Sequence, residues 1–258
     1  MIGEIVPAKV VKVVKENILV CSIYLEPESR ISRPRPGQFL MIWVPGYEEV
    51  PMSISGYYGD TLRITVAAVG PTTKRLHKTQ IGEYLGIKGP LGNGLKLRNI
   101  KYLLIGGGYG VAPLIYAMQE IKRIGGESTI IIGARTKEQL LMVDEAKKIG
   151  NVFVSTDDGS YGYEGTAYDL FIDVGDNLDY DEVLVCGPKP LLIKVAKYCV
   201  EKNVKCWVFA EEYMKCGIGL CGSCVLGMSS ILICREGPVL DAETFVSAIS
   251  IHNDFYFS

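Results

Sequence analysis

The hydrophobic pattern of this 258-residue chain changes near residue 100, and that change constrains the fold most strongly. Before it, short runs rich in valine, isoleucine and leucine alternate with turn dipeptides such as Pro36-Gly37 and Gly89-Pro90. Short, evenly spaced runs predict a small antiparallel β-barrel, with an immunoglobulin-like sandwich as the alternative. The strands expected here cover residues 9–14, 18–25, 38–44, 61–69 and 83–88.

From residue 100 to about 210, continuous apolar runs alternate with helical patterns. Residues 190–202, for example, place apolar side chains at the i, i+3, i+4 and i+7 positions of one helix face. This alternation predicts a buried parallel sheet with helices on both faces. The expected strands are 101–105, 128–134, 151–156, 182–186 and 204–210. The first expected helix ends near residue 124, and the others cover 138–148, 167–172 and 190–202.

Composition narrows the class of protein. The net charge is −2 and no run of lysine or arginine stands out, which argues against a nucleic-acid partner. The N-terminus lacks a secretion signal, and the uncharged stretch 102–118 is interrupted by glycines and Pro113, so we expect no membrane span. We therefore expect a cytoplasmic protein of three domains, with limits at residues 1–99, 100–210 and 211–258.

Four cysteines in a glycine-rich run define the third part: Cys216, Cys221, Cys224 and Cys234. Their C-x4-C-x2-C spacing, with the fourth cysteine further on, predicts the thiolate ligands of a [2Fe–2S] cluster, and hence a one-electron carrier. The glycines between them allow the positive φ angles of a tight loop. A zinc site is the first rival and disulfides the second. The other four cysteines lie in apolar runs typical of reduced core residues.

Two glycine motifs follow predicted strands directly. The first is the run Gly106, Gly107, Gly108, Tyr109 and Gly110, which stands between a strand and a helix. Such glycines let a backbone approach a pyrophosphate at a helix N-terminus, or serve only tight packing. The second motif, at 186–188, begins with Cys186, either a site residue or a core thiol at a strand end. In a parallel sheet both motifs lie at the carboxyl edge, where ligands bind.

This order of barrel, strand-GGG-helix and strand-CGP resembles the ferredoxin–NADP reductase superfamily of flavin enzymes. The cysteine tail, together with the sequence TDDGSYGYEG at 156–165, is similar to the electron-transfer subunit of NAD-linked dihydroorotate dehydrogenase. The resemblance covers nearly the whole chain. It implies three cofactors, namely FAD, a [2Fe–2S] cluster and NAD.

The resemblance also implies residue roles. Nicotinamide-nucleotide binding falls to the glycines of the first motif and Pro113, with Cys186 as the catalytic residue near the nicotinamide ring. The cluster ligands are the four cysteines of the tail. Flavin-binding roles fall on three segments: Pro51, Met52, Ser53 and Ile54; Thr65, Val66 and Ala67; and Gly70, Thr72 and Thr73.

Two positions depart from the family pattern. Val50 and Ala67 stand where the family carries arginines near the flavin phosphates. Lys74 and Arg75 are candidates to replace that charge, or are solvated surface residues. The choice between FAD and FMN therefore stays open at this point, as does the choice between NAD and NADP, for which Arg135 is a candidate. Asp157 and Asp158 are interpreted as a turn or nucleotide contact before any catalytic role.

The resemblance implies a partner as well. An FMN-containing catalytic subunit would oxidise dihydroorotate, and two such subunits with two electron-transfer subunits would form a heterotetramer in pyrimidine biosynthesis. A flavin exchanges both hydride and single electrons, so it belongs between nicotinamide and cluster. Candidate partner contacts, or core residues of the tail, are Tyr213, Met214, Leu220 and Leu226. The alternatives are a subunit of a hydrogenase or sulfite reductase, a free-standing reductase, and a zinc-stabilised nucleotide-binding module.

Overall fold

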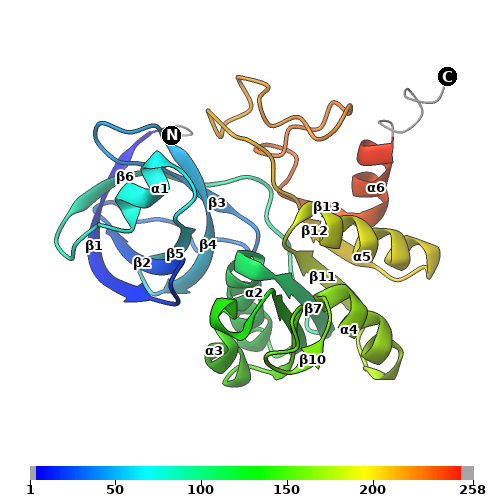
Figure 1. Ribbon diagram of the computed structural model, residues 1–258. Helices are drawn as coiled ribbons and strands as arrows, with labels where there is room; N and C mark the ends of the chain where they lie inside the picture. The colour runs from blue at the N-terminus through cyan, green and yellow to red at the C-terminus, as the bar shows by residue number, and fades with distance from the viewer. Residues whose placement is uncertain (1–3, 251–258) are drawn as a thin grey trace.

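A computed structural model describes residues 4–250, and its first part is a closed six-stranded antiparallel barrel (Figure 1). The predicted barrel is confirmed, and the sandwich alternative is wrong. Around the barrel the order is β1-β2-β5-β4-β3-β6. The elements are β1 (Val6–Lys15), β2 (Val20–Pro27), β3 (Phe39–Trp43), β4 (Val50–Tyr58), β5 (Thr61–Ala67), the short helix α1 (Pro71–Leu76) and β6 (Tyr84–Leu91).

Side chains along each strand point alternately into and out of the barrel, and those that point inward form its apolar interior. In β5, the side chains of Leu62, Ile64 and Val66 are fully buried within the barrel core. Arg63 and Thr65, at the intervening positions, point to the outer face. Strand β4 is absent from the sequence-based expectations, because its Pro51 and Gly56 interrupt the β-branched pattern that marks the other strands.

The second part is a seven-stranded sheet in the order β10-β9-β8-β7-β11-β12-β13, parallel except for β13. The predicted parallel sheet is confirmed. The strands are β7 (Lys101–Gly107), β8 (Glu127–Ala134), β9 (Asn151–Thr156), β10 (Tyr163–Glu164), β11 (Glu182–Cys186), β12 (Cys206–Phe209) and β13 (Val239–Asp241).

Helices cover both faces of this sheet. One face carries α2 (Val111–Arg123) and α3 (Val143–Lys147), and the other carries α4 (Ala167–Val174), α5 (Lys189–Glu201) and α6 (Ala242–Ser250). The prediction of one helix over 138–148 is wrong. The segment contains a 3-10 turn (Lys137–Gln139) and then α3, separated by Met142 in the left-handed region at φ 54°.

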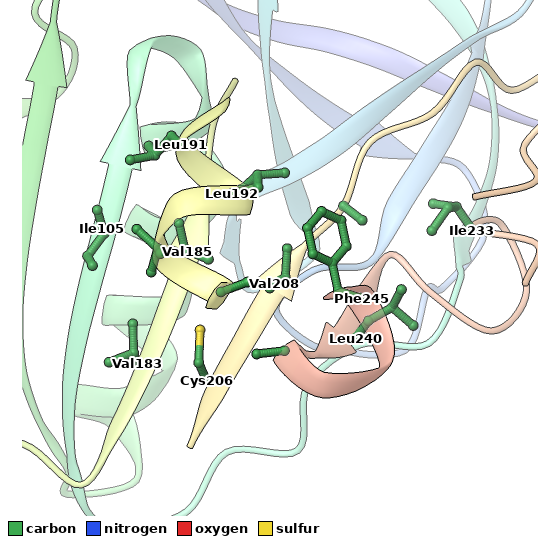
Figure 2. Close-up of a cluster of buried hydrophobic side chains, with 14 of the residues drawn as sticks. Ile105, Val183, Val185, Leu191, Leu192, Cys206, Val208, Ile233, Leu240 and Phe245 are labelled. Atoms are coloured by element: carbon green, nitrogen blue, oxygen red, sulfur yellow. The ribbon is translucent and has the colours of Figure 1, made fainter. Parts of the chain in front are cut away.

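The tail shares its core with the sheet domain. Figure 2 shows Val185 and Val208 from the sheet beside Phe245 of α6, with Ile233 of the cysteine-rich segment close by. Strand β13 pairs with β12, so the tail also extends the sheet. The limits at residues 99 and 210 stay predictions. Within residues 4–250, no helix has the length and apolar character needed to cross a bilayer.

Candidate redox site

The two glycine motifs meet backbone to backbone at the carboxyl edge of the sheet. A Cβ built on Gly110 would lie 2.6 Å from both Cα and N of Gly187. Gly187 itself has φ +151°, in the region that favours glycine. Side chains at Gly106 or Gly107 would also collide, since their Cβ atoms would lie 2.8 Å from Val111 and Leu191 respectively. The structure therefore brings both predicted motifs together and leaves no room there for side chains.

Two helix N-termini converge on this edge. Helix α2 follows Gly110 and helix α5 follows Pro188, and neither cap residue makes a side-chain hydrogen bond to the helix. Neither first turn contains an acidic residue. Pro113 lies in the first turn of α2, where its missing N–H breaks no helical hydrogen bond. Two positive dipole ends without a competing carboxylate in the first turn fit the pyrophosphate of a dinucleotide.

Cys186 ends β11 in the middle of the same edge. In the sheet register it is flanked by Gly106 of β7 and Phe209 of β12. Burial raises the pKa of the Cys186 thiol far above its usual range, and the nearby Glu211 carboxylate adds to the shift. The thiol is therefore neutral at physiological pH and has no role as a base. Sequence reasoning missed Glu211, although an acidic residue directly after a buried strand was the available signal.

The predicted flavin strand lies on the barrel wall. On β4, Pro51 and Met52 are partly buried and Ser53 is exposed, whereas the side chain of Ile54 points into the barrel core. Val66 on β5 also points inward, so only its backbone and that of Ile54 can face a ligand outside the barrel. These positions fit a ring laid against strand backbone, and their flavin roles stay predictions.

Local hydrogen bonds occupy the hydroxyl groups near the predicted flavin. Thr65 Oγ1 lies 3.0 Å from Ser22 Oγ and 2.8 Å from Ser55 Oγ. Thr73 Oγ1 accepts from the Gly70 N–H at 2.8 Å, which caps α1, and Thr72 Oγ1 donates to the Glu48 carbonyl at 3.1 Å. These threonines therefore shape the turn first, and backbone N–H groups remain for a phosphate.

The two candidate cations on α1 differ. Arg75 is paired with Glu83 at 2.8 Å and also contacts Thr79, so its charge is already matched. Lys74 is exposed beside the turn that contains Gly70. Ala67 is partly buried against the core shared with the sheet domain. Lys74 is thus the better placed of the two cations to compensate for the arginines missing at Val50 and Ala67.

At the far end of the sheet edge, Arg135 is exposed at the end of β8. Asp158 follows β9, and its Oδ1 accepts hydrogen bonds from the N–H and hydroxyl of Ser160. These bonds lower the pKa of Asp158. The interpretation of the Asp157-Asp158 pair as a turn feature is confirmed for Asp158.

The cysteine loop follows β12 and is held open by glycines. Gly217, Gly219, Gly222 and Gly227 all have positive φ, at 71°, 82°, 73° and 56°. This confirms the expectation that the loop requires glycine at these positions. None of the eight cysteines forms a disulfide, and Cys21, Cys199 and Cys206 are buried core thiols as expected.

The four predicted cluster cysteines lie as two pairs. Cys221 lies close to Cys216, and Cys234 lies close to Cys224. Cys224 and Cys234 are buried, whereas Cys221 is exposed. Across the described part of the chain, no three His, Cys, Asp or Glu side chains are grouped to hold a single ion. Two pairs fit a binuclear cluster, because each of its irons takes two cysteines.

Polar donors surround these sulfurs. The backbone N–H of Gly219 points to Cys234 Sγ at 3.2 Å, and that of Leu220 to Cys216 Sγ at 3.4 Å. The N–H of Cys234 lies 3.4 Å from Cys224 Sγ. The hydroxyl of Ser223 lies 2.9 Å from Cys221 Sγ and, as the largest cause, lowers the pKa of that thiol to about 6. These donors favour the thiolate of the exposed Cys221, whereas burial raises the pKa of the inner Cys234 to about 12.

The cysteine loop packs onto the barrel next to the predicted flavin strand (Figure 1). A Cβ built on Gly217 would lie 2.6 Å from Met41 Cγ and 3.1 Å from Leu91 Cδ1. Met41 lies on β3, directly opposite Pro51 of β4 in the sheet register. The cluster loop therefore contacts the buried side chain of Met41, and Met41 is paired with the first residue of the predicted flavin motif on the neighbouring strand.

Several apolar side chains are exposed around Cys221. Leu220 is 81% exposed, and Tyr213 and Met228 are 65% and 56% exposed. Of the four residues singled out from the sequence as partner contacts or core residues, Met214 and Leu226 are buried, so the core alternative holds for these two. The exposed apolar side chains of the cysteine-rich segment are Tyr213, Leu220, Val225 and Met228, and we refer to them as the cluster face.

Comparisons with known proteins agree with this site. Residues 211–246 match a family described as the iron–sulfur cluster binding domain of dihydroorotate dehydrogenase B, and residues 104–197 match an oxidoreductase NAD-binding domain. A probable dihydroorotate dehydrogenase B (NAD+) electron transfer subunit from Thermoplasma volcanium is 38% identical over 92% of this chain and 90% of its own length. The chain belongs to this electron-transfer subunit family. A Methanocaldococcus jannaschii relative with the same name is 38% identical over 80% of the chain and 78% of its own length.

Solved structures share the fold of this chain. The structure of an NADH-dependent reduced ferredoxin–NADP oxidoreductase, studied for flavin-based electron bifurcation, superimposes with a TM-score of 0.83 at 29% identity. The superposition covers 96% of this chain and 94% of the neighbour's chain. A ferredoxin reductase of carbazole 1,9a-dioxygenase, at 19% identity and a TM-score of 0.67, shares the fold. The electron-transfer subunit described here is therefore an oxidoreductase subunit with an iron–sulfur domain, and the zinc interpretation is wrong.

Proposed function

We propose that this subunit passes electrons from a dihydroorotate-oxidising catalytic partner to NAD+, by way of its iron–sulfur loop and a flavin held on the barrel. The relatives are named as electron transfer subunits of dihydroorotate dehydrogenase B, which supports a separate catalytic partner. The observation that carries the proposal is the contact of Gly217 with Met41, the residue opposite Pro51. That contact holds the one-electron site beside the strand predicted to bind the flavin.

Different residues of this chain bind the flavin and the dinucleotide. When bound, the flavin exchanges hydride with nicotinamide and single electrons with the cluster. The glycine edge and the N-terminus of α2 bind the dinucleotide, and Cys186 limits the space beside its ring. The Cys186 thiol is neutral and takes no proton, and the edge orients the dinucleotide. Lys74 and the turn at Gly70 hold the flavin phosphates, and FAD is the flavin that the resemblance favours.

The cluster face is the proposed docking surface for the catalytic partner. Its apolar side chains belong to the same segment as Cys221, the exposed member of the outer pair. Burying Leu220 and Tyr213 against a partner would remove apolar surface from water and exclude solvent from the cluster. We also propose a cytoplasmic heterotetramer of two catalytic and two electron-transfer subunits.

Replacing one cluster ligand tests the proposal. The protein is purified without oxygen, alone and co-expressed with a candidate catalytic subunit, and its iron, acid-labile sulfide and flavin are quantified. We expect Cys221→Ser to abolish dihydroorotate-to-NAD+ electron transfer while NADH still reduces the flavin at nearly the original rate. The control is Ser230→Ala, at an exposed position of the same loop. Equal loss of both reactions in Cys221→Ser would contradict the proposed order of carriers.

A second candidate comes from the electron-bifurcating neighbour, whose match spans nearly the full length of both chains. The same subunit could serve a ferredoxin- and NADP-linked partner in place of a dihydroorotate-linked one. The partner decides between them. Reduction of NAD+ by dihydroorotate in the co-purified complex supports the first candidate, and activity only with reduced ferredoxin and NADP+ supports the second.

A further inference from the structure

Ser223 stands apart from the other donors around the cluster cysteines. The contacts to Cys216, Cys224 and Cys234 come from backbone N–H groups. Cys221 is the one of the four that also meets a side-chain hydroxyl, at 2.9 Å from Ser223 Oγ, within the described residues. A side-chain donor can be removed by substitution without changing the backbone, which makes its contribution measurable.

The direction of this hydrogen bond follows from the chemistry of the ligand. In the thiol form either atom could donate, but a cluster-bound cysteine is a thiolate without a proton. The hydroxyl must then donate to the sulfur. A donor to a charged acceptor stabilises it more strongly than a donor to a neutral one. The bond therefore favours the more negative state of whatever Cys221 binds.

We propose that Ser223 sets the reduction potential of the iron–sulfur cluster through its hydrogen bond to Cys221. This inference rests on the cluster assigned to the family domain and deepens the proposed function. The reduced cluster differs from the oxidised one by one added electron, with no bond made or broken. Hydrogen bonds to the cluster sulfurs and their exposure to solvent are what tune this equilibrium.

The position of Cys221 makes the effect functional. Cys221 and Cys216 form the outer pair, with Cys221 exposed on the cluster face, whereas Cys224 and Cys234 are buried. Electrons arriving from a partner on that face meet the outer pair first. A higher potential there favours acceptance from the partner, and a lower one favours release toward the flavin. Ser223 thus biases how far the cluster is reduced during turnover.

The test is a redox titration of the full-length chain with dithionite as the electron source. The reduced cluster is monitored by electron paramagnetic resonance. We expect Ser223→Ala to shift the equilibrium about tenfold toward the oxidised cluster, which is a fall of about 59 mV for one electron. Ser223→Thr keeps the hydroxyl and is expected to restore the original potential. Ser230→Ala, in the same loop, is expected to leave it unchanged. An unchanged potential in Ser223→Ala overturns the inference.

If the alanine variant fails to fold, two variants with side chains of equal size replace it. Ser223→Val removes the hydroxyl while keeping the size of threonine, so a lower potential in the valine variant than in the threonine variant supports the inference. Loss of iron in both the alanine and valine variants, but not in threonine, means that the hydroxyl only holds Cys221 in place and overturns it. Absence of iron and sulfide in the unsubstituted chain contradicts the proposed function itself.

Discussion

At the scale of single residues, the sequence predicted those whose chemistry is local. The cluster cysteines follow from spacing alone, because three of the four lie within one short loop. Ser223 and Arg63 could not be predicted in this way. Ser223 matters through the direction of one hydroxyl, and Arg63 bonds to Glu145, which lies on a helix of another domain. No pattern of apolar residues encodes either contact.

Gly110 is the residue whose replacement most directly tests the dinucleotide edge. A methyl group there would meet the backbone of Gly187 at 2.6 Å, and backbone cannot move aside as a flexible side chain can. We expect Gly110→Ala to separate the two turns and reduce NADH-to-flavin turnover at least tenfold, measured by stopped-flow absorbance. Gly46→Ala is the control, because it strains a left-handed backbone at φ +84° but has nothing within 4 Å of the added methyl group. Equal activity in the two variants would contradict the assignment of this edge.

At the scale of elements, long apolar runs were predictable and interrupted ones were not. Strands β9 and β11 match their predicted limits, since continuous apolar runs in a parallel sheet are distinctive. Helix α3 is shorter than predicted because the backbone of Met142 has left-handed φ. Packing, and not the local sequence pattern, determines this conformation. Strand β13 was missed because three residues carry too little pattern, although it ties the tail to the sheet.

The cluster loop offers a matched pair of glycines for testing its contact with the barrel. Gly217 and Gly222 have nearly equal positive φ, at 71° and 73°, so alanine strains both backbones equally. Only Gly217 contacts Met41, whereas nothing lies within 4 Å of Gly222. We expect Gly217→Ala to slow electron transfer between cluster and flavin while Gly222→Ala changes it little. Iron content and rapid-mixing kinetics measure this, and equal effects would argue against the contact as the link.

At the scale of the whole molecule, the orientation of the two large domains depends on their shared interface. Helix α2 packs on the barrel, and Tyr116 from that helix is fully buried in the barrel core, where its hydroxyl donates to the Pro34 carbonyl at 2.6 Å. Beside it, Gln119 of α2 contacts both Tyr58 of β4 and Glu145 of α3. A flavin on the barrel and a dinucleotide on the sheet can meet only if this interface is rigid.

Arg63 is the buried charge at the centre of that interface. Its side chain is 2% exposed, its Nη1 donates to Glu145 at 2.8 Å, and its Nη2 donates to the Ser55 carbonyl at 2.5 Å. Burial alone would lower the pKa of Arg63, but the hydrogen bond and charge of Glu145 raise it overall, so the guanidinium stays charged. The rings of Tyr24 and Tyr58 lie within 6.0 Å of the guanidinium. The barrel and the sheet domain are thus joined by an ion pair whose guanidinium is buried and whose carboxylate is 30% exposed.

We expect Arg63→Met to destabilise the protein by about 3 kcal/mol, because Glu145 and the Ser55 carbonyl lose a buried partner. The melting temperature should fall by about 8 °C. Since the domains then hold each other less firmly, the KM for NADH should rise as well, although Arg63 lies away from the glycine edge. Arg75→Met is the matched control, because it breaks an ion pair of the same 2.8 Å length whose two partners are 30% and 32% exposed. That variant should cost at most about 1 kcal/mol and leave the KM unchanged. Equal effects of the two substitutions on melting and KM would contradict a clamp between the domains.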